Sequence, residues 1–283
     1  MHNAGKYAIY IATLYGRFNA VLPLESWLVK MNLDRIIAVR NNKTIYRDGS
    51  CSVKVFENGY SQPEIYREAY IQTLMHSIGL NVPKVQKVTE INGKTAIVFE
   101  YIQGRSLADM INSYPEKCEE FTVLIADLQY NISRKKASIR LLKEFISDSL
   151  QKSALSENEI NELTDLLNEL PQKNELLHGE LIPQNIVLSR DGTPYIIDWE
   201  YASQGDVCYG HAATCISLLA DRNNQAVRYY LDTVYDRYSI ASEEIVRWLP
   251  LASVALSNGY FGNKRQFLLD HVHCLVGRNG GNI

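Results

Sequence analysis

The spacing of apolar residues changes near Gly104, and this change constrains the fold more than any other feature of the sequence. Before Gly104, short apolar or alternating runs are typical of β-strands, and turn dipeptides such as Asp48-Gly49 and Asn92-Gly93 separate them. One longer segment, Gln62–Ile78, has its apolar residues at helical spacing. The expected strands are Ile36–Val39, Thr44–Arg47, Ser52–Phe56, Val82–Val85 and Thr95–Phe99.

After Gly104, apolar residues recur at three- and four-residue steps, which is typical of amphipathic helices. One β-hairpin interrupts this pattern, because Ile186–Leu188 and Tyr195–Ile197 flank the turn dipeptide Asp191-Gly192. The sequence therefore predicts an α+β fold, with a small five-stranded antiparallel lobe followed by a larger, mainly helical lobe. Helices are expected over most of Ser106–Ile111, Phe121–Asn131, Ile139–Leu150, Asn158–Leu170, Ala212–Leu219, Asn224–Tyr235 and Glu243–Leu256.

Charge and composition argue against several classes of function. The chain has 29 Lys and Arg against 32 Asp and Glu, so it has no positive excess with which to neutralise a nucleic-acid backbone. The longest apolar run near the start, Tyr7–Tyr15, is much shorter than the ~20 residues that span a bilayer. The five cysteines are scattered and never form a C-x-x-C pair. We expect a cytoplasmic protein that binds neither nucleic acid nor membranes.

The strongest chemical signal surrounds the hairpin. Glu180 and Asn185 precede its first strand, and Asp198 follows its second strand. Phosphoryl transfer from a magnesium nucleotide uses one carboxylate to orient the attacking hydroxyl, and an amide oxygen and a second carboxylate to bind the metal. Each half of this pattern alone is more often a turn or a strand end, but the order and spacing of all three residues favour this chemistry.

The segment resembles the catalytic and metal-binding loops of the aminoglycoside phosphotransferase and choline kinase superfamily, which has the protein-kinase fold. In that family the motif is H-G-D-x-x-x-x-N, followed by an I-D-W or I-D-F strand end. The resemblance implies a bilobal kinase-like fold in which Glu180 is the catalytic residue and Asn185 and Asp198 bind the metal. It also implies ATP and Mg²⁺ as cofactors and a small-molecule hydroxyl compound as the acceptor. Glu180 departs from the motif, because it is one methylene longer than the usual aspartate.

The small lobe offers a cation for the nucleotide phosphates. Lys54 lies within an alternating apolar strand, and Glu68 on the following helix is placed to reach it, as the strand lysine and helix glutamate do in kinases. Two alternatives stay open at this point. Lys54 could be a solvated lysine on an edge strand, and Glu64, one turn from Glu68, could be the partner.

Two further nucleotide contacts are implied by the resemblance. The fifth expected strand and the residues after it are similar to the hinge that binds adenine in these kinases, with Glu100 and Ile102 as the candidate residues. The expected phosphate loop, Arg40–Thr44, contains no glycine, but asparagine tolerates the left-handed backbone that such a turn needs. Thr44 and Lys43 are candidates to supplement this loop.

The resemblance extends from Met31 to about Leu219 and is shared with a group of small bacterial kinase-like members. On this basis we expect three parts in the chain. Residues 1–30 form an accessory segment, residues 31–102 an N-lobe that binds the nucleotide, and residues 103–283 a C-lobe with the catalytic, metal and acceptor sites.

The sequence thus predicts an ATP- and Mg²⁺-dependent phosphotransferase that moves the γ-phosphoryl group to a hydroxyl of an aminoglycoside-, choline- or sugar-like acceptor. Aromatic and acidic residues after Asp198, among them Glu200 and Tyr201, would suit a quaternary ammonium or an amino sugar. A nucleotide-binding pseudokinase is an alternative, supported by Glu180 and the glycine-free loop. A protein kinase is less favoured, because no activation segment is recognisable between Asp198 and Asp206.

Overall fold

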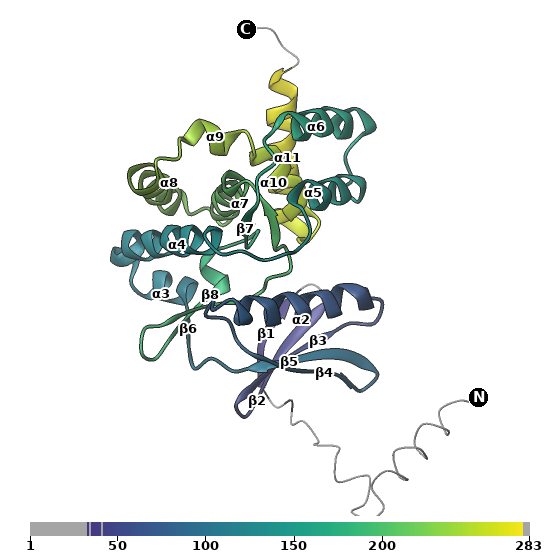
Figure 1. Cartoon of the computed structure of the whole chain (residues 1–283), viewed down its shortest axis with the longest axis vertical. Coiled ribbons are helices and arrows are strands. Elements are labelled where there is room, and N and C mark those ends of the chain that lie inside the picture. The colour runs from purple at the N-terminus through teal and green to yellow at the C-terminus, as the bar shows by residue number, and fades with distance from the viewer. Residues whose placement is uncertain (1–32, 34, 41, 280–283) are drawn as a thin grey trace, which may run out of the picture. The chain divides into compact units, whose positions relative to one another are not determined.

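The computed structural model describes residues 33–279, except 34 and 41, so the predicted accessory segment 1–30 lies outside the described residues (Figure 1). The N-terminal region contains one antiparallel sheet with the strand order β1-β2-β3-β5-β4. This sheet confirms the predicted five-stranded region. Its strands are β1 (Arg35–Arg40), β2 (Lys43–Asp48), β3 (Cys51–Phe56), β4 (Val85–Ile91) and β5 (Lys94–Glu100).

The turns of the sheet follow the predicted dipeptides, but one strand was misplaced. Asn92 and Gly93 both have positive φ, 51° and 77°, as a tight hairpin turn requires, and Ile91 pairs with Lys94 across them. The strand before this turn is therefore β4, Val85–Ile91, and the predicted strand Val82–Val85 is wrong. Pro83 lies before β4, where its missing N–H removes no hydrogen bond from the ladder.

Helix α2 (Gln62–Ser77) connects β3 to β4 and runs alongside the sheet (Figure 1). Its Ile65 and Ala69 pack with Phe56, Ile97 and Phe99 of the sheet in a small hydrophobic core. Ile65 and Glu68 are three residues apart, so they lie on the same buried face of the helix. A charged side chain is thereby directed into the interior at the position where the sequence predicted a partner for Lys54.

The C-terminal region is mainly helical and contains the predicted hairpin, so the α+β fold class is confirmed. Two small sheets occur in it: β6, β8 and β9 form one, and β7 and β10 form the other. Two short 3₁₀ helices cover Pro115–Lys117 and Pro183–Asn185. The strands are β6 (Gly104–Ser106), β7 (Glu175–Leu177), β8 (Ile186–Ser189), β9 (Pro194–Ile196) and β10 (Ser203–Gly205). The helices are α3 (Leu107–Ser113), α4 (Cys118–Ser133), α5 (Leu142–Gln151), α6 (Glu157–Glu169), α7 (Val207–Ala220), α8 (Asn224–Tyr238), α9 (Ser242–Val246), α10 (Leu249–Ser257) and α11 (Gly262–Asn279).

The helices pack around one hydrophobic core, and buried residues on both sides of the hairpin belong to the same core. Helix α7 is buried along nearly its whole length, and Tyr130 of α4 stacks on Tyr238 of α8 at a centroid distance of 4.2 Å. Ile196 and Trp199, on either side of Asp198, belong to the same core. Asp198 is therefore held between two buried side chains on a rigid part of the molecule.

Two further observations concern the predicted segments and surfaces. The predicted helix Glu243–Leu256 is divided into α9 and α10, and α10 has Pro250 in its first turn, where a missing N–H is tolerated.

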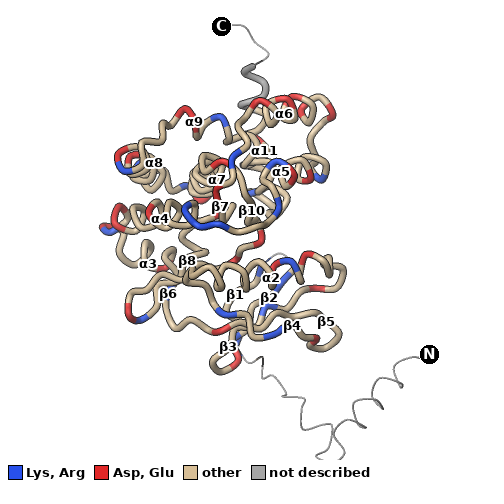
Figure 2. The backbone as a smooth tube through the Cα atoms, in the orientation of Figure 1, with Lys and Arg blue, Asp and Glu red and all other residues tan. Residues whose placement is uncertain are grey.

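Acidic positions gather on α6, whereas basic positions recur in the segment between α4 and α5 (Figure 2). Within the described residues, no helix combines the length and the apolar character that a membrane span requires.

Candidate active site

The loop between β7 and β8 begins with His178 and Gly179, and the fold explains why these two residue types stand there. Gly179 has φ 89°, and a Cβ there would lie 2.5 Å from the carbonyl oxygen of Tyr201, so only glycine fits. His178 accepts a hydrogen bond at Nδ1 from the backbone N–H of Glu180 (3.3 Å), and its Nε2 lies 3.0 Å from the carbonyl oxygen of Ile197. Burial lowers the pKa of His178 to about 4, so the neutral ring connects the two loops of the site.

Glu180 is buried and points into a cavity of about 390 Å³, which we call the Glu180 cavity. The hydroxyl of Tyr260 donates a hydrogen bond to Glu180 Oε1. Burial raises the pKa of Glu180 to about 7, although Tyr260 and Lys264 act in the opposite direction. The side chain therefore has the burial and the pKa that suit a group which accepts a proton near neutral pH.

Asn185 and Asp198 are fixed from the two sides of the hairpin. Asn185 Nδ2 donates to the carbonyl oxygen of Glu180 (3.0 Å), and the backbone N–H of Ile197 donates to the carbonyl oxygen of Asn185 (2.9 Å). Asp198 has φ 64°, a left-handed conformation that is uncommon outside glycine. Such backbone strain persists where the surrounding structure enforces it and is frequent at functional sites.

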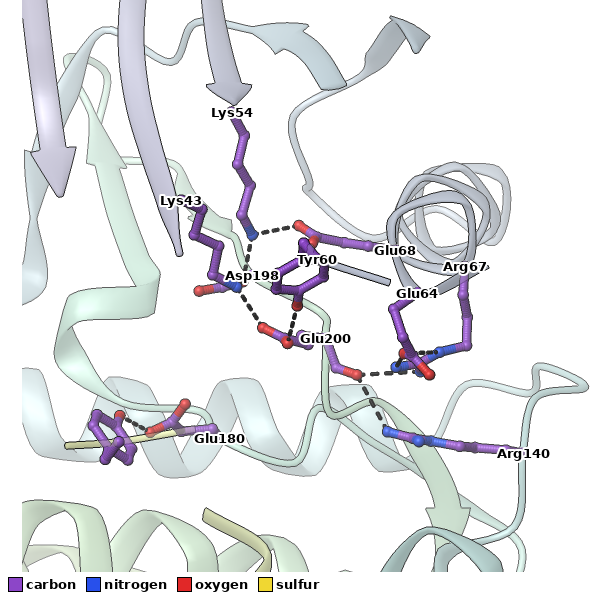
Figure 3. Close-up of polar contacts among 11 residues, drawn as sticks. Lys43, Lys54, Tyr60, Glu64, Arg67, Glu68, Arg140, Glu180, Asp198 and Glu200 are labelled. Carbon is purple, nitrogen blue, oxygen red and sulfur yellow. Dashed lines mark hydrogen bonds and ion pairs between the residues drawn. The ribbon is translucent and has the colours of Figure 1, made fainter. Parts of the chain in front are cut away.

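Lys54 joins the sheet region to this hairpin (Figure 3). Its Nζ lies 2.5 Å from Glu68 Oε1 and 2.9 Å from Asp198 Oδ1, and Lys54 is only 6% exposed. Burial disfavours the charge of Lys54, but Asp198 and Glu68 hold its pKa well above the ordinary value. The structure thus pairs Lys54 with Glu68, whereas the alternative partner Glu64 pairs with Arg67. The contact of Lys54 with Asp198 was not among the sequence-based expectations.

Asp198 is ionised in this arrangement and is suited to a metal. Although burial opposes its charge, the ammonium groups of Lys54 and Lys43 hold the pKa of Asp198 well below the ordinary range. Among the described residues, no group of three or more His, Cys, Asp or Glu could hold a metal ion by itself. One carboxylate and one amide oxygen fit Mg²⁺, which keeps waters and binds substrate phosphates in place of a full protein cage.

A second cavity, of about 540 Å³, is lined by Lys54, Glu68 and Asp198, by apolar side chains such as Phe99, and by further polar side chains such as Arg105. We call it the Lys54 cavity. Ile102 lines it, which is compatible with the predicted adenine contact. Glu100 and Thr44 are not part of its lining.

The two predicted residues outside the lining take part in the sheet. The side chain of Glu100 is exposed and its backbone N–H donates to the carbonyl oxygen of Lys84 (2.9 Å). Thr44 lies opposite Val55 in the β2–β3 ladder. Their roles in nucleotide binding stay predictions.

The glycine-free turn between β1 and β2 places a lysine side chain near the site. Asn42 adopts φ 54°, the left-handed conformation that the sequence allowed for. Lys43, which follows it, is buried with its Nζ 2.5 Å from Glu200 Oε2 and 4.0 Å from Asp198 Oδ1. The hydroxyl of Tyr60 donates to the other oxygen of Glu200 at 2.7 Å (Figure 3). Two ammonium groups therefore converge on the carboxylate of Asp198.

Sequence reasoning missed Tyr260 and Lys264, which contact or face Glu180 from the far end of the chain. No local pattern marks either residue. A motif with a defined spacing was available only for the residues around the hairpin and on α2.

Comparisons with known proteins identify a family and a shared fold. The model of the phosphotransferase enzyme family, APH, matches residues 38–240, which is more than half of the chain. No curated protein matches the sequence.

Among solved structures, the aminoglycoside phosphotransferase APH(4)-Ia has a TM-score of 0.62 at 14% identity, over 99% of this chain and 100% of that one. The choline kinase LicA from Streptococcus pneumoniae has a TM-score of 0.60 at 19% identity, over 87% and 95%. A thermostable APH(4)-Ia mutant has been solved with ADP and hygromycin B; its TM-score is 0.61 at 15% identity, over 87% and 94%. At these identities the likeness shows a shared fold.

Proposed function

The chain belongs to the phosphotransferase enzyme family, and we propose that it transfers the γ-phosphoryl group of ATP, with Mg²⁺, to a hydroxyl group of a small molecule. The observation that carries this proposal is the position of Lys54, whose ammonium group contacts both Glu68 and Asp198 beside a cavity of nucleotide size. A buried lysine between these two carboxylates is the arrangement that holds nucleotide phosphates in kinases.

Each residue of the site has a separate task in this reaction. Lys54 binds the α- and β-phosphates, and Glu68 keeps its ammonium group in place. Asn185 and Asp198 supply oxygen ligands to Mg²⁺, which neutralises phosphate charge when bound. Glu180 accepts a hydrogen bond from the acceptor hydroxyl and orients it for attack, so catalysis rests mainly on positioning and charge neutralisation.

The Asp198→Ala variant tests the assignment. We expect MgATP-dependent phosphoryl transfer to fall roughly a thousandfold or more, because the variant loses a metal ligand. Asp236→Ala, which removes an exposed carboxylate from α8, is the matched control and is expected to keep full activity. Circular dichroism establishes that both variants fold. Wild-type turnover in a folded Asp198→Ala protein would contradict the proposal.

A pseudokinase is the second candidate, and two observations favour it. Glu180 stands where the family motif has an aspartate and accepts a hydrogen bond from Tyr260, and the expected phosphate loop has no glycine. Slow ATP hydrolysis without acceptor, lost in Glu180→Gln, supports the enzyme. Binding of MgATP without hydrolysis or transfer across a broad panel of hydroxyl acceptors supports the pseudokinase.

A further inference from the structure

A third cavity, of about 190 Å³, lies next to the Glu180 cavity, because Glu200, Tyr201 and Gly259 line both. It is lined on its other sides by Arg67 of α2 and by Arg140, which precedes α5. We call it the Arg140 cavity. Neither arginine has a task in the proposed phosphoryl transfer.

The guanidinium group of Arg140 has unused hydrogen-bond donors. It lies over the ring of Phe145, 4.0 Å from the centroid, and its Nη2 donates to the carbonyl oxygen of Glu200 at 3.3 Å. Arg67 donates to the same carbonyl oxygen at 3.2 Å (Figure 3). The Nε of Arg140 is buried and has no hydrogen-bond partner among the described residues. A buried donor without a partner costs free energy, unless a ligand binds it.

The carboxylates of Glu64 and Asp148 lie near Arg140 and favour its charge, but neither is a direct ion-pair partner. Arg67 is neutralised by Glu64, and the carboxylate of Glu200 is bonded to Lys43 and Tyr60. Arg140 forms no ion pair with a described carboxylate. Burial and the nearby Arg67 lower the pKa of Arg140 to about 10, which leaves it charged at neutral pH.

Two further charged residues, Asp148 and Lys152, line the cavity from α5 and its end. Asp148 and Lys152 carry opposite charges, so together they do not change the net charge of the cavity lining. With Glu64 and Glu200 included, acidic and basic side chains are equal in number in this lining. Arg140 differs from the others in having a buried N–H group without a partner among the described residues, and its planar guanidinium matches the two oxygens of a carboxylate or a phosphate.

The lining of the Glu180 cavity is compatible with the same acceptor chemistry. Its lining includes the basic residues Arg40, Lys43 and Lys264. Its two carboxylates are already bonded, Glu180 to Tyr260 and Glu200 to Lys43. Lys43 is paired with Glu200 and Lys264 with Asp221, so Arg40 is the basic residue of this lining that has no ion pair among the described residues.

We propose that the acceptor is a small hydroxyl compound with an anionic group, a carboxylate or a phosphate, and that Arg140 binds this group. The proposal rests on the proposed function, because it assigns the substrate class of the same site. It replaces the amino-sugar and quaternary-ammonium acceptors that the aromatic and acidic sequence after Asp198 suggested.

Binding of inorganic phosphate tests Arg140 without any turnover. In the presence of MgADP and at constant ionic strength, a tenfold excess of phosphate over its Kd should raise the melting temperature by about 2–4 °C. Arg140→Met keeps the apolar contact with Phe145 and should lose this rise. Arg134→Met is the matched control, because Arg134 is exposed and lies over the ring of Tyr130. An equal rise in Arg140→Met means that phosphate binds elsewhere, which overturns the proposal.

Transfer to matched acceptors tests the substrate class. Serine and ethanolamine differ by one carboxylate, as do glycerate and ethylene glycol, and glycerol 3-phosphate adds a phosphate to glycerol. We expect the wild type to prefer the anionic member of each pair, and Arg140→Met to raise the KM for that member at least tenfold with little change in the KM for ATP.

The outcomes separate the two proposals. Preference for the neutral or cationic members, or an unchanged acceptor KM in Arg140→Met, refutes the anionic acceptor and leaves phosphoryl transfer intact. If the wild type neither hydrolyses ATP nor phosphorylates any acceptor, the proposed function fails, and the phosphate-binding experiment still decides whether Arg140 binds an anion.

Discussion

The protonation of Glu180 is determined by groups from distant parts of the chain. Its burial favours the neutral form, whereas the hydroxyl of Tyr260 donates to its oxygen and favours the carboxylate. The longer side chain, compared with the aspartate of the family motif, ends against this hydroxyl. With its pKa raised to about 7 by burial, Glu180 changes its protonation near neutral pH. Acceptor activation should therefore respond to small changes around this carboxylate.

The Tyr260→Phe variant tests this balance. If ionised Glu180 accepts the proton, kcat/KM falls as the pH drops below about 7. Removal of the hydroxyl takes away a hydrogen bond to the charged form, so the pKa rises and the acidic limb moves to higher pH by about one unit. Tyr235→Phe on α8, at an exposed tyrosine, is the control. If the acidic limb of the kcat/KM profile lies at the same pH in Tyr260→Phe and the wild type, the hydroxyl does not affect the titration of Glu180.

Residues near the hairpin and on α2 could be predicted from the sequence, and Tyr260 could not. Lys54 lies on a regular strand and Glu68 on a regular helix, and the periodicity of each element predicts which way the side chain points. Tyr260 meets Glu180 across 80 positions of sequence, through packing of the segment before α11. Arg140 was missed for the same reason, since its environment is formed by α2, the Glu200 carbonyl and Phe145.

At the level of elements, the β1–β2 turn replaces glycine amides with a side chain. Asn42 takes the left-handed conformation, and Lys43 directs its ammonium group to Glu200 and toward Asp198. An ammonium group is a mobile point charge with three donors, so it can exchange a carboxylate for a phosphate oxygen. We therefore expect Lys43 to contact the nucleotide phosphates.

Lys43→Met should raise the KM for ATP about tenfold, because one charge-assisted contact to phosphate is lost. Lys43→Arg keeps the charge and should recover part of this loss. Lys87→Met, at an exposed position of β4, is the matched control. Melting temperatures separate a binding effect from unfolding, since Glu200 loses its partner in Lys43→Met. If the KM for ATP is the same in Lys43→Met and wild type, backbone amides rather than Lys43 hold the phosphates.

Elements with a long periodic run or a turn dipeptide were predictable, and short strands that pair with distant segments were not. The five-stranded sheet, α2 and the β8–β9 hairpin follow from periodicity and turn dipeptides. Strands β6, β7 and β10 have three residues each, too few to show an alternation. Their pairing depends on distant partners, as in the register of Ser203 opposite Leu177.

Considered as a whole, the described part of the molecule buries the side chains of two histidines, and this burial favours their neutral form. His178 and His211 are both buried, and burial lowers each pKa to about 4. His211 lies on α7, with its Nδ1 2.7 Å from the hydroxyl of Tyr230. The weak opposing effect of Asp206 does not restore its basicity. Folded and unfolded chains therefore bind different numbers of protons in mild acid.

This difference predicts how His211 affects stability. Between pH 6.5 and 4 the unfolded chain protonates this histidine and the folded chain does not, so the free energy of unfolding decreases as the pH falls through that window. The contribution is at most about 1.4 kcal/mol per pH unit. His211→Gln removes it, so the variant should lose less stability than the wild type as the pH is lowered from 6.5 to 4, whatever its stability at pH 7.

Urea unfolding at several pH values measures this slope. His76→Gln, at an exposed position of α2, should follow the wild-type slope, because the replaced side chain meets water in both states. Glu180 also titrates near this range, but it is present in all three proteins, so its contribution cancels in the comparison. Parallel curves for wild type and His211→Gln would show that His211 is protonated in the folded chain or shielded in the unfolded one, and that burial on α7 does not set its charge.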